Sequence, residues 1–489
     1  MSIKSAKSVV YFIFSLVAMF FTICPVTLKI MHFELCLNYA TVPPLIVLLM
    51  CVSTIIPFSV VIRGLLGPAS PAQYIDASNS NLIPLTVVLL FISLAYVCIS
   101  ADFSGLFKLI ATKFKNAALR SIFKQLIGML LFYAFAGVFT LCTSNDIVIL
   151  CLTPIIIEFV NQLNDQSVLI PLLICQFSSA NTFSISLLTG NPSNFILTSV
   201  FKIDFIQYLK PMVFVGVSAG IVVLIFSLVY LKLFKQQSKN YEQFGDLVQP
   251  KIGITLLNGS EIIPNEPEKE ETVKMDKFNA VFSTVCLILM FVAFILSPFI
   301  TKVAPKFDLS YIAVVFAAVQ LSKDVYLHKK KRVNVFEVIK ALPWGVPLFL
   351  IGMFIIVENA INLGVIHWIA QGLANAFEGQ SAFVVSLAVS AITVLACILF
   401  NNLPGTIVVS RIINDSALLN LKYLKVAALS AAAASNYGAL MGPHCSLAGL
   451  MWTKMTGKEH QFKTWASQAI IGITCIVVCS GVVSLVRNL

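Results

Sequence analysis

The stretch Leu141-Cys142-Thr143-Ser144-Asn145-Asp146 places a carboxylate and small polar residues between two apolar runs, Gln125–Phe139 and Ile147–Phe159. Each run is long enough for only part of a bilayer crossing, which takes about 20 residues. An ionisable residue in such a setting is costly, and by default it marks a substrate site or an ion pathway. The alternative is a polar loop outside the membrane that joins two short helices. We favour a site inside the membrane.

A second stretch of the same kind, Phe400-Asn401-Asn402-Leu403-Pro404-Gly405, lies in the other half of the chain between Phe383–Leu399 and Thr406–Ile413. Backbone that leaves its helical path at membrane depth is tolerated only where protein or a water-filled cavity surrounds it. The interrupted runs therefore predict two re-entrant helical hairpins, each of which enters and leaves the membrane on the same side.

The composition excludes a soluble protein. Of the 489 residues, 58% are hydrophobic and only 11% are charged. A water-soluble fold of this size could not bury so much apolar surface, so the sequence predicts an all-α polytopic membrane protein. About ten apolar runs can serve as transmembrane helices: Ser8–Cys24, Thr41–Ile62, Leu82–Ser100, Leu169–Leu188, Met212–Leu233, Phe278–Ile300, Leu309–Ser322, Val346–Val357, Val426–Met441 and Ala466–Val486.

The charges and the cysteines exclude other classes of protein. The net charge of +11 falls mostly in short loops, where it orients a membrane protein, so we expect no nucleic-acid partner. The 12 cysteines lie in or beside apolar runs without CxxC spacing, which indicates packing residues and no metal site or disulfide framework. No catalytic motif is present, and we expect neither an enzyme nor a cofactor other than a coupling proton or Na⁺.

One long polar stretch divides the membrane sequence. Residues 235–277 predict a flexible cytoplasmic linker, with 1–234 as the first membrane half and 278–489 as the second. Two groups of basic residues predict cytoplasmic loops: Lys108, Lys113, Lys115, Arg120 and Lys124, and Lys323, Lys329, Lys330, Lys331 and Arg332. We expect an integral multi-pass protein, in the plasma membrane in preference to an organelle membrane.

The two halves repeat the same order of features. Each has a span, an interfacial helix, a broken hairpin, and a span interrupted by glycine and proline, at Gly190-Asn191-Pro192-Ser193-Asn194 in the first half and Gly442-Pro443-His444-Cys445-Ser446 in the second. An odd number of crossings in each half makes the copies inverted. Paired interrupted segments in inverted halves indicate the midplane binding site of a secondary transporter.

Four helix breaks that meet at the midplane would surround a small polar solute or ion. Each break exposes backbone N–H and C=O groups, and the asparagine side chains add donors and acceptors. The predicted substrate-binding residues are Thr143, Ser144, Asn145, Gly190, Asn191, Ser193, Asn194, Asn401, Asn402, Gly442, His444, Cys445 and Ser446, and the predicted coupling-ion residues are Asp146 and His444.

The breaks resemble the arsenite permease branch of the ion transporter superfamily, which also includes sodium/proton antiporters and the melanosomal P protein. Thr143–Leu150 followed by Leu152–Ile156 resembles the first hairpin of that branch. Gly190–Asn194, Asn401–Pro404 and Ser446–Trp452 resemble its other three signatures, although Gly442-Pro443-His444-Cys445 departs from the expected Gly/Asn/Thr-rich turn. The resemblance implies a scaffold domain and a mobile transport domain that carries the hairpins in an elevator-like movement.

Individual side chains allow more than one interpretation. We favour Asp146 as the coupling residue, because a midplane carboxylate can take up a proton or bind Na⁺; the alternative is a structural acid that caps a half-helix. His444 could carry a proton or act as a structural donor.

Four further residues have roles that the sequence leaves open. Cys142 and Cys445 could bind trivalent arsenic, but we favour small packing residues. Arg411 could meet an anionic substrate, but we favour a side chain that snorkels outward toward Asp415. Glu358 is expected near the interface, with a proton relay as the alternative.

The leading hypothesis is an ion-coupled secondary transporter of a small inorganic or polar solute, with proton-coupled efflux of the arsenite or antimonite type as the specific expectation. A Na⁺/H⁺ antiporter, and an organic or inorganic anion permease or gated anion channel, are the alternatives. The expected partners are a small-molecule or ion substrate and the lipid bilayer. A homodimer is compatible with the sequence, and a separate ATPase subunit is not expected.

Overall fold

The computed structural model describes residues 6–23, 26–30, 33–38, 40–67, 84–242, 254–255, 261–262, 276–304, 307–456 and 461–487. Within these ranges the regular structure is helical, apart from two small antiparallel sheets formed by β1 (Val26–Ile30) with β2 (Phe33–Leu37) and by β3 (Ile254–Thr255) with β4 (Glu261–Ile262).

The α-helices of the first half are α1 (Ala6–Ile23), α2 (Val42–Val52), α3 (Phe58–Leu66), α4 (Pro84–Asp102), α5 (Leu106–Arg120), α6 (Lys124–Cys142), α7 (Asn145–Leu163), α8 (Leu169–Phe183), α9 (Pro192–Phe201) and α10 (Phe205–Glu242). Those of the second half are α11 (Lys277–Val303), α12 (Leu309–Lys329), α13 (Val335–Lys340), α14 (Gly345–Asn362), α15 (Val365–Phe377), α16 (Ala382–Phe400), α17 (Asn402–Ile413), α18 (Leu424–Tyr437), α19 (Leu447–Thr456) and α20 (Gln461–Val486).

Ten helical segments of the described chain are long and apolar enough to cross a membrane: Pro84–Asp102, Lys124–Leu141, Asn145–Leu163, Gln166–Ser186, Phe205–Leu233, Lys277–Ile300, Leu309–Lys329, Val335–Asn362, Ala382–Phe400 and Thr464–Val486. The prediction of an all-α multi-pass protein with about ten such helices is confirmed. The helices in this set differ from the predicted spans. The set includes both helices that flank the first break, α6 and α7, and the helix before the second break, α16.

The arms of the first break are longer than their apolar runs. Helices α6 and α7 have 19 residues each, which corresponds to about 28 Å of a hydrocarbon core of about 30 Å. The expectation of partial crossings is wrong for these arms, because polar flanking residues continue the helices. It fits α17, which has 12 residues. The re-entrant path of the hairpins stays a prediction, because length does not decide it.

The predicted span Thr41–Ile62 is also interrupted. It forms α2 and α3 with a break between them, where Thr54 has φ +56° and Pro57 has extended backbone. Proline supplies no N–H to a preceding helical turn and disfavours a helical residue before it, so the helix ends there.

Helix α10 continues beyond the predicted end of the first membrane half. It reaches Glu242, so residues 235–242 of the predicted linker are helical. Most of the linker's remaining residues lie outside the described ranges, and the division into two membrane halves stays a prediction.

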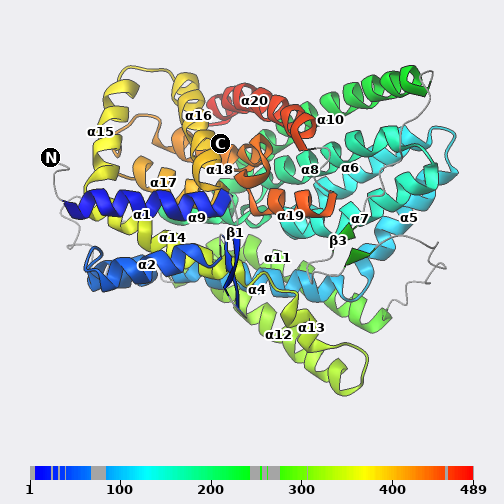
Figure 1. Ribbon diagram of the computed structural model, residues 1–489, viewed down its shortest axis with the longest axis horizontal. Helices are drawn as coiled ribbons and strands as arrows, with labels where there is room; N and C mark the ends of the chain where they lie inside the picture. Colours follow the sequence, from blue (N-terminus) through cyan, green and yellow to red (C-terminus); the bar gives the residue numbers. More distant parts are fainter. Residues whose placement is uncertain are drawn as a thin grey trace.

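The helices form two layers (Figure 1). The lower layer contains α4, α11 and α12, which pack on one another, together with α13 and α14. The upper layer contains α6, α8, α10, α16, α18 and α20, which also pack side by side. Helices α7, α9, α17 and α19, each of which begins directly after a break, belong to the upper layer through their contacts with α8 and α18 or with one another. A site between the layers would therefore be bordered by helix N-termini.

The connections between the layers are alike in the two halves. Gly105 precedes α5 with φ +78°, and Gly364 precedes α15 with φ +74°. Positive φ costs glycine little and other residues more, so each glycine allows the chain to turn sharply from α4 into α5 and from α14 into α15. Helices α5 and α15 correspond to the interfacial helices that the sequence predicts from apolar residues at helical spacing in Phe103–Phe114 and Ile366–Phe377.

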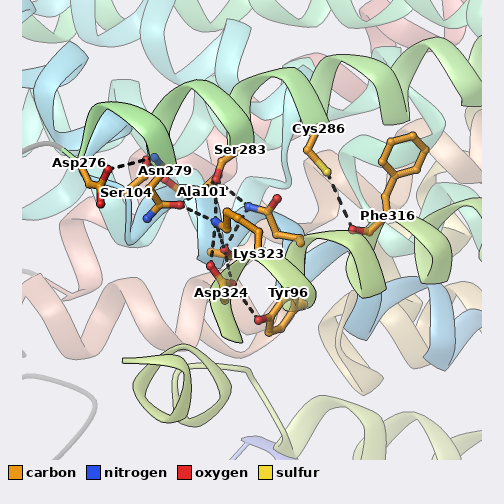
Figure 2. Close-up of polar contacts among 12 residues, drawn as sticks. Tyr96, Ala101, Ser104, Asp276, Asn279, Ser283, Cys286, Phe316, Lys323 and Asp324 are labelled. Carbon is orange, nitrogen blue, oxygen red and sulfur yellow. Dashed lines mark hydrogen bonds and ion pairs between the residues drawn. The ribbon is translucent and has the colours of Figure 1, made fainter. Parts of the chain in front are cut away.

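A buried polar network fastens the lower layer together (Figure 2). The Lys323 ammonium of α12 pairs with Asp324 Oδ1 at 2.7 Å, and it donates hydrogen bonds to Asn279 and to Ser283 of α11. The Asp324 carboxylate also accepts hydrogen bonds at 2.6–2.8 Å from two hydroxyls of α4, those of Tyr96 and Ser100.

The network corrects one assignment. The assignment of Lys323 to a basic loop is wrong, because its side chain is 2% exposed inside α12. Asp324, the next residue along the helix, supplies the opposite charge that a buried ammonium requires.

Replacing Gly405 by alanine should destabilise the pair α16–α17. A Cβ at Gly405 would lie 2.9 Å from the carbonyl carbon and oxygen of Ala396, so backbone would have to move. We expect a thermal midpoint several degrees lower for purified Gly405→Ala in detergent. Gly372→Ala is the control, because a Cβ at Gly372 meets nothing within 4 Å. Equal midpoints for the two variants would show that the close approach does not constrain the fold.

Candidate functional site

The first break is confined to two residues. Helix α6 ends at Cys142, Ser144 precedes α7 with extended backbone, and Asn145 and Asp146 lie in the first turn of α7. The Asn145 amide donates to Asn181 Oδ1 of α8 at 2.9 Å, whereas its own Oδ1 has no hydrogen-bond partner. Asp146 stands at the positive end of the α7 dipole.

The break between α8 and α9 is longer than the motif Gly190–Asn194. It begins with the 3₁₀ turns Ser184–Ser186 and Leu188–Gly190. A Cβ at Gly190 would lie 2.6 Å from the Ser184 carbonyl oxygen, so only glycine fits there. Asn191 then caps α9, its Oδ1 accepting from the Ser193 N–H at 3.1 Å, and its Nδ2 has no partner.

A network of amides and hydroxyls joins this break to the second half of the chain. The Asn194 amide donates to the Ser184 carbonyl at 2.8 Å, and Asn194 Oδ1 accepts from Asn436 Nδ2 of α18 at 2.8 Å. Asn436 Oδ1 in turn accepts from the Ser184 hydroxyl at 2.7 Å. The Ser193 hydroxyl is bonded to that of Ser435 at 2.9 Å. Asn194 and Ser193 therefore hold α9 against α18 and are buried by this contact.

The break between α16 and α17 lies against the break between α18 and α19. Asn401 has φ +78° and ψ 159°, a conformation that non-glycine residues rarely adopt, and its amide donates to the His444 carbonyl at 2.9 Å. Asn401 Oδ1 and Asn402 Oδ1 are buried without hydrogen-bond partners. Ser446 caps α19 by accepting from the Gly449 N–H at 2.9 Å.

A cavity of about 920 Å³ lies between the two layers. Helices α4 and α13 and the start of α14 form one wall, and α7, α9 and α19 form the other. The polar and charged residues of its lining are Asp102, Thr143, Ser144, Asp146, Thr189, Asn191, Glu337 and Lys340. Glu337, Lys340 and Trp344 are exposed at its mouth, whereas Thr143, Thr189 and Asn191 are buried at its base.

The predicted site residues are thus divided between two places. Four of them line the cavity: Thr143, Ser144, Asp146 and Asn191. The other predicted residues are absent from the lining that the described residues form: Asn145, Gly190, Ser193, Asn194, Asn401, Asn402, Gly442, His444, Cys445 and Ser446. Asn145 reaches the Asn181 amide, and the second-half residues contact one another.

Three of the residues left open by the sequence are buried in the protein. Arg411 is only 9% exposed, so its side chain does not snorkel outward. Asp415, toward which it was expected to point, pairs with His367 at 2.8 Å. Glu358 is 3% exposed and pairs with Arg63 of α3 at 3.5 Å, so its side chain is buried in the protein, and its position near the membrane interface stays a prediction. Cys445 is fully buried away from the cavity lining, and the side chain of Cys142 lies outside the described part of the chain.

Sequence reasoning missed Glu337 and Lys340, which line the cavity, and four further residues near the site. Asp102 and Thr189 line the cavity, and Asn181 and Asn436 pair with site asparagines. A signal for the last two exists, because Ser179-Ala180-Asn181 and Ala434-Ser435-Asn436 each come shortly before a glycine-proline break. Asp102 follows an apolar run directly, where an acid is read by default as an interfacial residue.

The comparison with known protein families identifies the chain as a transporter. The sequence profile of the citrate transporter family CitMHS matches residues 33–438. The chain belongs to this family. It is therefore a membrane transporter, with a small molecule or an ion as its substrate, and the resemblance to the ion transporter superfamily is confirmed.

Individual relatives are more distant. An arsenical pump membrane protein of Escherichia coli is 26% identical over 391 residues, which cover 78% of this chain and 81% of the relative. A protein of the same name from Shigella flexneri is 24% identical over 390 residues, and one from Yersinia enterocolitica is 23% identical over 389 residues, with the same shares covered. These identities support transport at the level of the family and do not determine the substrate.

Proposed function

We propose that this protein is a secondary transporter that exports a small neutral oxyacid of the arsenite or antimonite type in exchange for protons. The observation that carries the proposal is the lining of the cavity. Asp146 lies there with Thr143, Ser144 and Asn191 at the N-termini of α7 and α9. Their hydroxyl and amide groups can bind a neutral solute, and the carboxylate can take up the coupling ion.

The unpartnered atoms of the site match such a solute. Asn191 Nδ2 is a free donor and Thr189 Oγ1 a free hydroxyl, both in residues at most 3% exposed. Arsenous acid carries hydroxyl groups that can accept from an amide and donate to a carboxylate. A buried polar group without a partner is costly, so a solute that satisfies these groups would be favoured over an apolar one.

The charges of the cavity argue against an anion such as citrate. The charged residues in its lining are three acids, Asp102, Asp146 and Glu337, and one base, Lys340. A carboxylate substrate would meet net negative charge in a partly desolvated space, which is unfavourable. The name of the family alone therefore does not decide the substrate.

We propose in addition that the two halves are inverted repeats and that the upper layer moves against the lower one. The order α4–α5–α6–α7–α8–α9–α10 in the first half corresponds to α14–α15–α16–α17–α18–α19–α20 in the second, and each half has its positive-φ glycine before the interfacial helix. The lower layer is fastened by the network around Lys323, which suits a scaffold. The networks of the upper layer join both hairpin regions into one unit, which suits a transport domain.

Flux measurements in proteoliposomes test the function. With an outward-directed proton gradient (acidic inside), we expect uptake of arsenite against its concentration that collapses with a protonophore, whereas the opposite gradient should drive no accumulation. Protein-free vesicles give the background rate. A pH change driven by Na⁺ in the absence of metalloid, with no arsenite flux, would instead identify a Na⁺/H⁺ antiporter, in which Asp146 binds the cation. Single-channel currents would identify a gated anion channel and contradict a carrier.

A further inference from the structure

Four consecutive basic residues stand at the end of α12, where the chain turns toward α13. We call them the basic tip: Lys329, Lys330, Lys331 and Arg332. All four are exposed, and a single acid, Glu337, lies between them and the start of α14. Arg332 pairs with Asp276 at 2.5 Å, whereas the three lysines form no ion pair with another residue of the described chain. The basic tip therefore presents three positive charges that are free to bind an anion.

The length of α12 brings the basic tip to the level of lipid headgroups. The helix has 21 residues, so it rises about 31 Å, which matches a hydrocarbon core of about 30 Å. The basic tip begins at its last residue and lies at the lower edge of the molecule in Figure 1. A group of Lys and Arg residues directly after a transmembrane helix is typical of a segment that binds anionic phospholipids.

Exposed aromatic rings lie on both sides of the basic tip. Tyr326 is 49% exposed, Phe336 is 68% exposed and Trp344 is 52% exposed. The Lys330 ammonium lies 4.4 Å from the centre of the Tyr326 ring. In water a ring such as that of Phe336 would expose apolar surface, whereas at a membrane interface it is covered by lipid. The combination of rings and lysines therefore favours a lipid surface over a loop that is only solvated.

The basic tip is directly connected to the mouth of the cavity. Helix α13 begins two residues after Val333, and Glu337, Lys340 and Trp344 line the cavity mouth. Val338 and Leu342 pack against α4 and hold the far side of α13 in place. A helix of six residues is not stable alone, so its position depends on what holds it at each end. A headgroup bound at the basic tip would hold the end of α13 that packing on α4 leaves free.

We propose that the basic tip binds the headgroup of an anionic phospholipid and that this contact fixes α13 at the mouth of the cavity. The three free lysines contact the phosphate, and the Phe336 ring enters the interface beside it. Arg332 keeps its pairing with Asp276. The binding of lipid is independent of what the protein transports. Its effect on the transport rate rests on the proposed function.

Hydrogen exchange tests the binding directly. The full-length protein is placed in nanodiscs of phosphatidylglycerol or of phosphatidylcholine, and the exchange of amides in residues 330–342 is followed by mass spectrometry. We expect exchange to be several-fold slower in phosphatidylglycerol, and high salt should remove the difference because it screens exposed charges. Equal exchange of the wild-type protein in the two lipids would overturn the proposal.

A triple variant, Lys329→Gln with Lys330→Gln and Lys331→Gln, assigns the effect to the basic tip. Each basic residue near an anionic surface contributes about five-fold to affinity, so removal of three should weaken headgroup binding about 100-fold. We expect the exchange of α13 in this variant to be the same in both lipids. Retention of the wild-type difference would show that the lipid acts elsewhere and would contradict the proposal.

The matched control removes three exposed basic side chains from the other group that the sequence predicts to be cytoplasmic. These are Lys113, Arg120 and Lys124, all replaced by glutamine, and none of them lines the cavity. The control variant has the same change in net charge and should keep the lipid-dependent exchange of α13. An equal loss in the two triple variants would mean that the overall charge, and not the basic tip, determines the response, and the proposal would fail.

Transport in proteoliposomes tests the effect on the cavity mouth. We expect gradient-driven arsenite transport by the wild-type protein to be several-fold faster in phosphatidylglycerol than in phosphatidylcholine, and the basic-tip variant to be equally slow in both. A loss of the same size in both lipids would mean that the lysines act through the chain itself, for example through the acids of residues 266–271, and would overturn the proposal. Lipid-dependent exchange without any arsenite flux would refute the proposed function and leave the lipid site established.

Discussion

Replacing Asp146 by asparagine is expected to abolish gradient-driven transport, lowering the rate to that of protein-free vesicles, while expression and thermal midpoint stay near wild type. Asparagine has nearly the size of aspartate, and the N-cap residue of α7 is Ser144, so the start of the helix should be retained. It cannot take up a proton or balance the charge of Na⁺. The measurement is arsenite uptake into proteoliposomes under an imposed pH gradient.

Two comparisons make this result specific. Asp146→Glu keeps the charge and should retain measurable driven transport, whereas solute exchange without a gradient should survive in Asp146→Asn if only coupling is lost. Full gradient-driven uptake by Asp146→Asn would rule out the coupling role. Equal loss of stability and transport would indicate instead that Asp146 acts mainly as a cap for α7.

The second large effect is expected at Asp324. Asp324→Asn leaves the Lys323 ammonium buried at 2% exposure without its counter-charge, and the loss of one partner of a buried pair costs about 3–5 kcal/mol. The thermal midpoint of the purified protein in detergent should fall by several degrees. Tyr96 and Ser100 of α4 also lose a charged acceptor, so α4 is loosened from α12.

A variant that removes both charges distinguishes the effect of an unpaired buried charge from that of losing the whole ion pair. The double variant Lys323→Met with Asp324→Asn should recover most of the lost stability, because replacing a whole buried pair is often close to neutral. The half-exposed ion pair between Arg332 and Asp276 is the matched control: Arg332→Met should cost about 0–1 kcal/mol. If Asp324→Asn cost no more than Arg332→Met, the network would not be what fastens the lower layer.

The fold follows from the sequence to a considerable degree, because the membrane imposes strict local rules. Apolar runs must be helical, since lipid offers backbone groups no partners, and breaks must occur where proline or glycine and small polar residues interrupt them. The breaks after Cys142, before Pro192 and after Phe400 are therefore readable. The ends of helices are less predictable. Helices α6 and α7 extend through polar residues that lie outside the apolar runs, and a proline lies between α2 and α3.

The site follows from the sequence only in part. Asp146, Thr143, Ser144 and Asn191 are predicted as site residues because a polar group in an apolar segment is costly wherever it lies, and all four line the cavity. Which polar groups face a cavity and which satisfy one another was not predictable. Asn194 has the same local setting as Asn191 but is bonded to Asn436, from a segment distant in the chain.

The charged residues show the same limit. Lys323 is preceded by an apolar run and followed by a basic loop, so the sequence pattern alone places it at the surface. Its burial is tolerated because it lies in a network of polar partners formed by Tyr96, Ser100, Asn279 and Asp324. Asp102 is likewise an ordinary helix-end acid until α7 and α13 enclose it. Hydropathy and helix-breaking chemistry, which act over a few residues, decide where the chain crosses the membrane and where it is interrupted. The partners of each buried polar group come from helices far apart in the chain, so only the packing of the two layers decides which groups remain free to bind a solute.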